Sequence, residues 1–169
     1  MKKKNLALSD LTDLCVIRAP FGALGIASEM TDSSLMISRI IYLPKGSKLI
    51  KPKNDLVRSA IDQLEAYFAN PDAVFTLPIK SAGTIYQQKV WSSVCEIQVG
   101  KTMTYGNLAK KIRSGARAVG TACGANPYPL IIPCHRVIAA RGLGGFMQHA
   151  GPNFYTDVKR WLLQHESRT

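Results

Sequence analysis

The sequence lacks several features that mark particular classes of protein. No apolar run approaches the ~20 residues needed to cross a membrane, and Met1–Lys4 is followed by aspartates rather than by the apolar core of a signal peptide. No CxxC pair is present, and the three histidines add no metal-ligand spacing to the four cysteines, Cys15, Cys95, Cys123 and Cys134. These absences predict a cytoplasmic protein with reduced thiols and without a metal site.

Acidic residues are also scarce. The 169 residues include 11 Asp and Glu against 22 Lys and Arg, and the excess lies after residue 81, where 11 basic residues face 3 acidic ones. A basic surface is typical of a protein that binds a polyanion, although solubility would explain the charge equally well. With 46% apolar and 20% charged residues, the chain has the composition of one ordinary globular domain or two small ones.

The first half of the chain has the pattern of a small α+β unit. Residues 14–18 and 23–27 predict a β-hairpin, and Leu35–Leu43 predicts a third strand. Asn54 is a candidate N-cap for an amphipathic helix that ends near Asn70. No combination of catalytic residues stands out in this half.

Helical patterns dominate the second half. One helix is expected to begin at Thr84, with five apolar residues on its buried side, Ile85, Val90, Trp91, Val94 and Ile97. A final helix is expected from about Phe154 to Glu166, with its buried side formed by Phe154, Val158, Trp161, Leu162 and His165.

Two short helices lie between them. Thr104 and Ser114 are candidate N-caps for helices over residues 105–112 and 115–124, joined by a tight turn that contains Gly115, which is the pattern of a helix-turn-helix. The second helix has almost no bulky side chain apart from Arg117. Such a helix suits either close packing or an approach to a minor groove only ~6 Å wide.

The most distinctive stretch of the chain places a thiol beside an imidazole. The apolar residues Leu130–Ile132 predict a strand that Pro133 ends just before Cys134 and His135. A free cysteine is usually a small buried hydrophobe, but a histidine neighbour can help to form the reactive thiolate. Adjacent side chains of a strand point to opposite faces, so this pair would need a bend or a bridging water.

Five segments together resemble, in order and spacing, the O6-alkylguanine-DNA alkyltransferases: Tyr105–Ala109, Ala116–Gly120, Asn126–Pro129, Ile132–Val137 and Trp161–Glu166. The resemblance extends from about Thr84 to Glu166. It implies an α+β fold with a ribonuclease H-like antiparallel-sheet domain over residues 1–80. Residues 81–169 would form a mostly helical domain with the helix-turn-helix and the active-site cysteine.

The resemblance also implies catalytic roles. Cys134 would take an alkyl group from O6 of guanine, and Glu166 would orient His135, which removes the thiol proton through a water. Tyr105 would donate a proton toward the guanine, and Asn126 would tie the helix-turn-helix to the active-site segment. No cofactor or metal is implied, and the stable thioether product would limit each molecule to one turnover.

The implied partner is double-stranded DNA that contains O6-alkylguanine, or possibly O4-alkylthymine, bound through its minor groove by a monomer that is cytoplasmic or nucleoid-associated. Arg117 would fill the gap left by a flipped base, and four other residues would contact DNA, Thr104, Tyr105, Ala118 and Gly120. Pro129, Val137, Gly145 and Phe146 would line the alkyl pocket. Relatives usually have a tyrosine near Phe146 and a shorter path to the last helix than residues 147–155.

Three other functions compete with this one. A lesion-binding protein without transfer activity would lack Cys134, and a helix-turn-helix regulator would need more long polar side chains than Ala116–Gly124 offers. A cysteine hydrolase would release its product and turn over.

Overall fold

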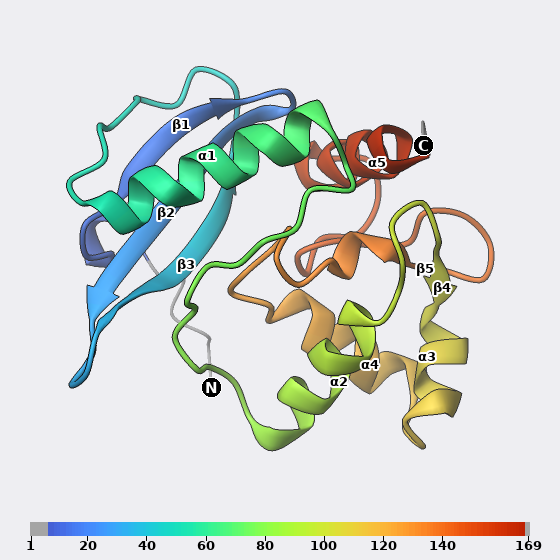
Figure 1. The fold of residues 1–169 in the computed structure, drawn as a ribbon. Helices are drawn as coiled ribbons and strands as arrows, with labels where there is room; N and C mark the ends of the chain where they lie inside the picture. The colour runs from blue at the N-terminus through green and yellow to red at the C-terminus, as the bar shows by residue number, and fades with distance from the viewer. Residues whose placement is uncertain (1–6, 168–169) are drawn as a thin grey trace.

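The computed structural model describes residues 7–167, so the lysine-rich Met1–Lys4 segment lies outside the described residues. An antiparallel sheet with one covering helix forms one side of the molecule, and a group of helices forms the other (Figure 1). This arrangement confirms the predicted α+β class. No helix in the described part of the chain has the length and apolar content that a bilayer span requires.

The sheet has the predicted hairpin and third strand. Its strands β1 (Cys15–Ala19), β2 (Gly22–Met30) and β3 (Leu35–Leu43) pair antiparallel in the order β1-β2-β3. The register places Ile26 opposite both Cys15 and Ile40, and all three side chains are buried. The glycine-containing second strand is longer than the predicted span of residues 23–27.

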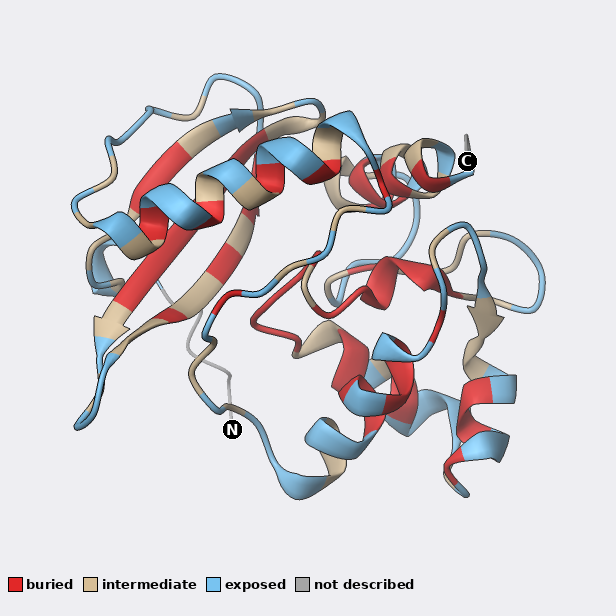
Figure 2. Cartoon of the chain, in the orientation of Figure 1, coloured by how far each residue is buried: buried red, intermediate tan, exposed pale blue. Residues whose placement is uncertain are grey.

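Helix α1 (Asp55–Ala69) covers one face of this sheet, as Figure 2 shows by its buried stripe. Asn54 caps the helix as predicted, because its side-chain oxygen accepts a hydrogen bond of 2.9 Å from the backbone N–H of Val57. The buried residues recur at helical spacing and face the sheet: Val57, Ala60, Leu64 and Tyr67.

Helix α2 (Ile85–Cys95) begins after Thr84, whose side chain accepts from the N–H of Gln87. Ile85 was predicted on the buried side and is 88% exposed instead. At 3.6 residues per turn, the nine positions from Ile85 to the buried Val94 make two and a half turns, so the two side chains point in opposite directions. The prediction for Ile85 was therefore wrong for a geometric reason.

The helix-turn-helix consists of α3 (Tyr105–Lys111) and α4 (Ala116–Gly124). Thr104, in the short strand β4 (Met103–Thr104), caps α3 as predicted by accepting from the N–H of Asn107. The predicted cap at Ser114 is wrong: Gly115 occupies the N-cap position of α4, and the Ser114 hydroxyl forms a 2.7 Å hydrogen bond with the hydroxyl of Tyr86.

The predicted strand before Cys134 is absent from the described chain. Pro127, Pro129 and Pro133 have no N–H to donate to a ladder, and Leu130 adopts a left-handed backbone with φ of 76°. A tight turn results, closed by a 2.9 Å hydrogen bond from the Ile132 N–H to the Tyr128 carbonyl. The chain then enters the 3₁₀ helix η2 (Cys134–Arg136) and the strand β5 (Val137–Ile138), which pairs parallel with β4.

The last helix, α5 (Phe154–Glu166), matches its predicted bounds and joins the two sides of the molecule. Its Trp161 ring packs edge-on against Phe21 and Phe68 at centroid distances of 5.5 and 6.1 Å, and its His165 side chain is half-buried against Tyr67. One apolar core therefore runs from the sheet to the helix-turn-helix. The division into domains at residue 80 stays a prediction.

Candidate active site

Cys134 begins η2 at the floor of a cavity of about 250 Å³. Its side chain is 3% exposed, and Asn126 Nδ2 donates both to Cys134 Sγ (3.4 Å) and to the Ile132 carbonyl (2.8 Å). Asn126 thereby links the end of α4 to the turn that carries the thiol. A hydrogen bond with Cys123, together with burial, raises the pKa of Cys134 well above its usual value, so Cys134 is a protonated thiol at rest.

His135 lies beside Cys134 and contacts a carboxylate from α5. Its Nε2 is 2.7 Å from Glu166 Oε1, and both side chains are 1% exposed. Burial lowers the pKa of His135 despite the opposing effect of Glu166, so the imidazole is neutral at pH 7. Because the carboxylate accepts, the ring proton resides on Nε2. Nδ1 is then a buried acceptor, and it has no hydrogen-bond partner among the described residues.

Two residues that the sequence analysis missed hold Glu166. Arg136 donates from Nε to Oε2 (2.9 Å) and from Nη2 to Oε1 (3.0 Å), while the Tyr67 hydroxyl donates to Oε1 (2.8 Å). Burial opposes ionisation of Glu166, but the hydrogen bonds from His135 and Arg136 outweigh it and hold its pKa well below the usual range. Arg136 was visible next to His135, whereas nothing in the sequence near Tyr67, on α1, pointed to this contact.

Lys159 is a third residue that the sequence analysis missed. Its side chain is completely buried, and Nζ donates to the carbonyls of Val137 (2.7 Å) and Gly145 (3.0 Å). Burial lowers its pKa to about 8. Lys159 lies seven positions before Glu166 on α5, two helical turns away on the same face, and this spacing could have revealed it.

Tyr105 and the loop after β5 form the mouth of the cavity. The Tyr105 hydroxyl donates to the Gly145 carbonyl at 3.2 Å, and burial raises its pKa, so the phenol keeps its proton. Of the four residues expected at the alkyl pocket, Gly145 and Phe146 line this cavity, whereas Pro129 and Val137 are buried outside its lining.

Residues 147–150 of the loop after β5 form part of the cavity wall. Met147 and Gln148 have left-handed backbones, and Gln148 Nε2 donates to the Gly124 carbonyl at 2.9 Å. A Cβ atom at Gly124 would lie 2.6 Å from Gln148 Cγ, so this contact requires glycine. The loop therefore docks on the end of α4.

The predicted DNA-contacting residues lie on α3 and α4 and at the N-cap of α3. Arg117 and Ala118 are exposed, and Gly120 is half-buried with the Tyr105 ring 3.9 Å from the position of a Cβ. Thr104 is half-buried and engaged as the cap of α3. An exposed arginine thus projects from the N-terminal turn of a helix whose other end borders the cavity.

Comparison with known proteins shows which proteins share this architecture. A family model described as the DNA-binding domain of 6-O-methylguanine DNA methyltransferase matches residues 85–168. A crystal structure of Mycobacterium tuberculosis O6-methylguanine methyltransferase has a TM-score of 0.74 and 32% identity, covering 92% of both chains. A crystal structure of the protein from the same organism in complex with DNA has a TM-score of 0.73 and 34% identity, covering 92% of this chain and 93% of that one. The fold and site define a DNA-binding protein with a buried cysteine.

Curated relatives identify the family more narrowly. A methylated-DNA–protein-cysteine methyltransferase of Methanosarcina mazei is 42% identical over an alignment of 138 residues that covers 77% of this chain and 84% of the relative. A second, from Mycobacterium bovis, is 47% identical over an alignment of 129 residues that covers 75% of this chain and 78% of the relative. The chain belongs to the family of methylated-DNA–protein-cysteine methyltransferases.

Proposed function

We propose that this protein repairs DNA by moving the alkyl group of O6-alkylguanine onto Cys134 Sγ, once per molecule. The observation that carries the proposal is the buried series Glu166, His135 and Cys134, with the acceptor nitrogen of His135 unpaired among the described residues. Family membership and the DNA complex of a relative support DNA as the partner.

The thiol needs a base because burial and its hydrogen bond with Cys123 keep it protonated. Neutral His135 would supply that base through Nδ1, taking the Cys134 proton by way of a water. The resulting imidazolium would be stabilised by Glu166, which Arg136 keeps ionised. Arg136 is thus a positioning residue in this scheme rather than a group that touches the substrate.

Transfer would form a bond from Cys134 Sγ to the alkyl carbon and break the bond from that carbon to O6, whose electron pair stays with the guanine. Tyr105 would donate its phenolic proton toward the departing base, since a developing anion inside a cavity is otherwise poorly stabilised. The S-alkylcysteine is a thioether that nothing in the site hydrolyses, which explains one turnover per molecule.

A base within a duplex cannot reach a thiol at the floor of a cavity, so the nucleotide would have to flip, at a cost of a few kcal/mol. We assign Arg117 to the gap left in the stack because it is the exposed long side chain at the start of the lean helix α4. Its small neighbours Ala118 and Gly120 would let the helix enter the minor groove. We extend the same proposal to O4-alkylthymine.

The first test is the intact mass of the protein after incubation with a duplex that contains O6-methylguanine. A single gain of about 14 Da that maps to Cys134 would support transfer, because a methyl group replaces the thiol hydrogen. The controls are the unmodified duplex and Cys134→Ala, which should bind DNA without gaining mass. Protein that binds the lesion but stays unmodified would indicate damage sensing, and several product equivalents per protein would indicate a hydrolase.

A further inference from the structure

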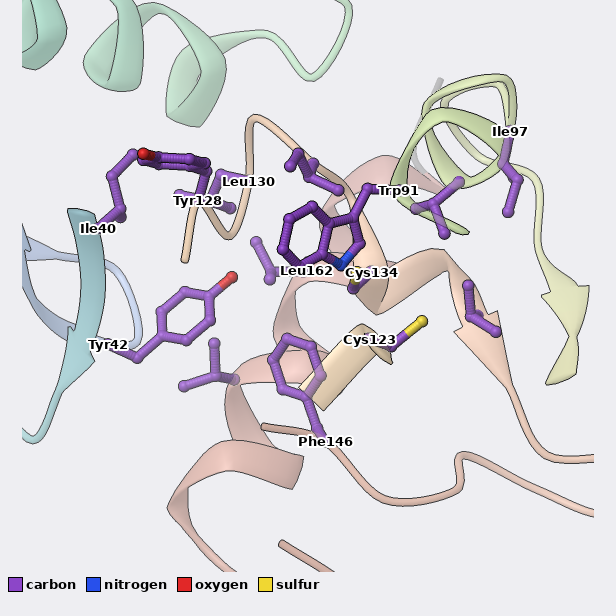
Figure 3. Close-up of a cluster of buried hydrophobic side chains, with 14 of the residues drawn as sticks. Ile40, Tyr42, Trp91, Ile97, Cys123, Tyr128, Leu130, Cys134, Phe146 and Leu162 are labelled. Carbon is purple, nitrogen blue, oxygen red and sulfur yellow. The ribbon is translucent and has the colours of Figure 1, made fainter. Parts of the chain in front are cut away.

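The cavity that holds Cys134 contains a second thiol. Cys123, in the last turn of α4, is 5% exposed and lines the same cavity of about 250 Å³. Figure 3 shows both cysteines within one cluster of buried side chains, and each of the two thiols shifts the pKa of the other. The mechanism proposed above leaves Cys123 without a role.

The two thiols differ in how readily they ionise. The hydrogen bond from Cys134 lowers the pKa of Cys123 despite its burial, and the buried ammonium of Lys159 lowers it further. The same hydrogen bond raises the pKa of Cys134. A thiolate that forms in the resting cavity is therefore favoured at Cys123, with the protonated Cys134 beside it.

We propose that Cys123 and Cys134 form an oxidation site, in which hydrogen peroxide converts the two thiols into an intramolecular disulfide. The disulfide would block alkyl transfer reversibly and protect the nucleophile from irreversible oxidation. Its effect on repair rests on the proposed function, whereas its formation does not.

The chemistry needs only the peroxide. The Cys123 thiolate attacks one peroxide oxygen, the O–O bond breaks, and the products are a sulfenic acid and hydroxide. Cys134 Sγ then attacks the sulfenic sulfur, the S–S bond forms, the S–O bond breaks, and the leaving hydroxide takes the thiol proton. Two thiols and one peroxide give one disulfide and two waters.

The cavity is suited to this reaction because part of its rim is exposed. Gln148, His149 and Ala150 line it and are open to solvent, so a molecule as small as peroxide can enter. Without a neighbouring thiol, an oxidised Cys134 would proceed to sulfinic acid, which reducing agents do not reverse. With two thiols in one cavity, a sulfenic acid at either cysteine is instead closed to the disulfide by the other thiol.

The other two cysteines provide matched controls, since neither lines the cavity. Cys95 is exposed on α2, and Cys15 is buried in the sheet, where burial raises its pKa. Cys95→Ser therefore removes a more accessible thiol than Cys123 while leaving the site intact.

The test uses the full-length reduced protein, treated with hydrogen peroxide, alkylated with iodoacetamide and digested with trypsin. Cleavage after Arg117 and Arg136 releases residues 118–136 as one peptide that carries both cysteines. We expect this peptide to lose about 2 Da and to resist alkylation, and dithiothreitol to restore both alkylation sites. Cys95→Ser should give the same result.

Alkyl-transfer rates test whether the disulfide protects Cys134, whereas the peptide mass tests only whether the disulfide forms. After peroxide and then dithiothreitol, wild-type and Cys95→Ser proteins should recover alkyl transfer to near their own untreated rates, while Cys123→Ser should stay roughly tenfold or more below its untreated rate. A gain of about 16 or 32 Da at Cys134 in the wild type, with Cys123 still free to alkylate, would overturn the proposal. If untreated protein fails to transfer alkyl groups, the proposed function fails, but the mass of the 118–136 peptide still decides whether the disulfide forms.

Discussion

The two halves of the molecule bury different kinds of side chain. Among residues 7–80, with tyrosines counted as aromatic core, Ser28 is the only polar residue that is buried. Among residues 81–167 the buried set also includes an amide, an imidazole and three charged groups, Asn126, His135, Arg136, Lys159 and Glu166. Burying a charge costs several kcal/mol unless it is well paired, so the second half concentrates its costly groups in the segment that holds Cys134 and in helix α5.

The contrast shows what each half contributes. The sheet and α1 form an apolar platform, and its closest link to the site is the Tyr67 hydroxyl, which donates to Glu166 across the two halves. The second half supplies the thiol, the base and the charges, and it holds them through backbone turns and helix α5. Changes to the buried polar groups, to the exposed arginine of α4 and to protonation should therefore affect the second half more than the sheet.

Removing the charge of Glu166 should have the largest effect. Glu166→Gln leaves the Arg136 guanidinium buried without its carboxylate, which we expect to lower the free energy of unfolding by about 3–5 kcal/mol. Alkyl transfer should also slow by roughly 10²-fold or more because His135 loses its charged partner. Urea unfolding and single-turnover rates measure the two effects.

The matched control is Glu96→Gln, which removes an exposed carboxylate that pairs with Lys111 and should change stability by less than about 1 kcal/mol. Equal losses in the two variants would mean that the buried cluster around Glu166 is no more important than a surface ion pair.

Arg117→Ala should separate DNA handling from chemistry. We expect transfer from a duplex to slow about 10- to 100-fold, which corresponds to losing ~1.4–2.8 kcal/mol of support for the flipped state. Reaction with free O6-benzylguanine should be nearly unchanged because Arg117 is exposed at the far end of α4 from the cavity. Arg160→Ala, an exposed arginine on α5, serves as the control. Equal slowing on both substrates would exclude the role in base flipping.

Transfer should lose its base at low pH. The pKa of His135 is depressed below about 6.5, so the imidazole is neutral at pH 7, and the rate should fall by up to about tenfold per pH unit once the pH drops below that depressed pKa. A rate that stays constant down to pH 5 would argue against His135 as the base.

Stability should fall over a partly different pH range. Folding lowers the pKa of both His135 and Glu166. The stability that His135 contributes is therefore lost as the pH falls below its unfolded pKa of about 6.5, and the stability that Glu166 contributes is lost as the pH falls below its unfolded pKa of about 4.3. Circular dichroism at each pH of the rate measurement therefore distinguishes protonation of the base from acid unfolding.

Ser28→Ala should have the smallest effect. It removes the acceptor of a 2.8 Å hydrogen bond from Asn54 Nδ2 and should lower the free energy of unfolding by about 1 kcal/mol, with no change in transfer rate. A large loss of transfer would show that the sheet contributes to catalysis beyond supporting the site.

Local patterns in the sequence predicted most of the fold. The hairpin, the third strand, the Asn54 cap and the bounds of α5 follow from turn residues, caps and apolar spacing, which act over a few neighbouring residues. The failures at Ser114 and at Leu130–Ile132 have a different cause. Ser114 is engaged by Tyr86 from another helix, and the prolines around Leu130 leave its apolar segment unable to pair as a strand.

The sequence by itself determined the identity of the thiol and its imidazole neighbour, because they are adjacent in the chain and lie within a distinctive motif. Tertiary structure alone decided what surrounds them. Tyr67 reaches Glu166 across 99 positions, Lys159 is drawn into the core by two carbonyls, and Cys123 meets Cys134 in one cavity. Contacts between distant segments depend on how helices pack, and no local pattern encodes that packing.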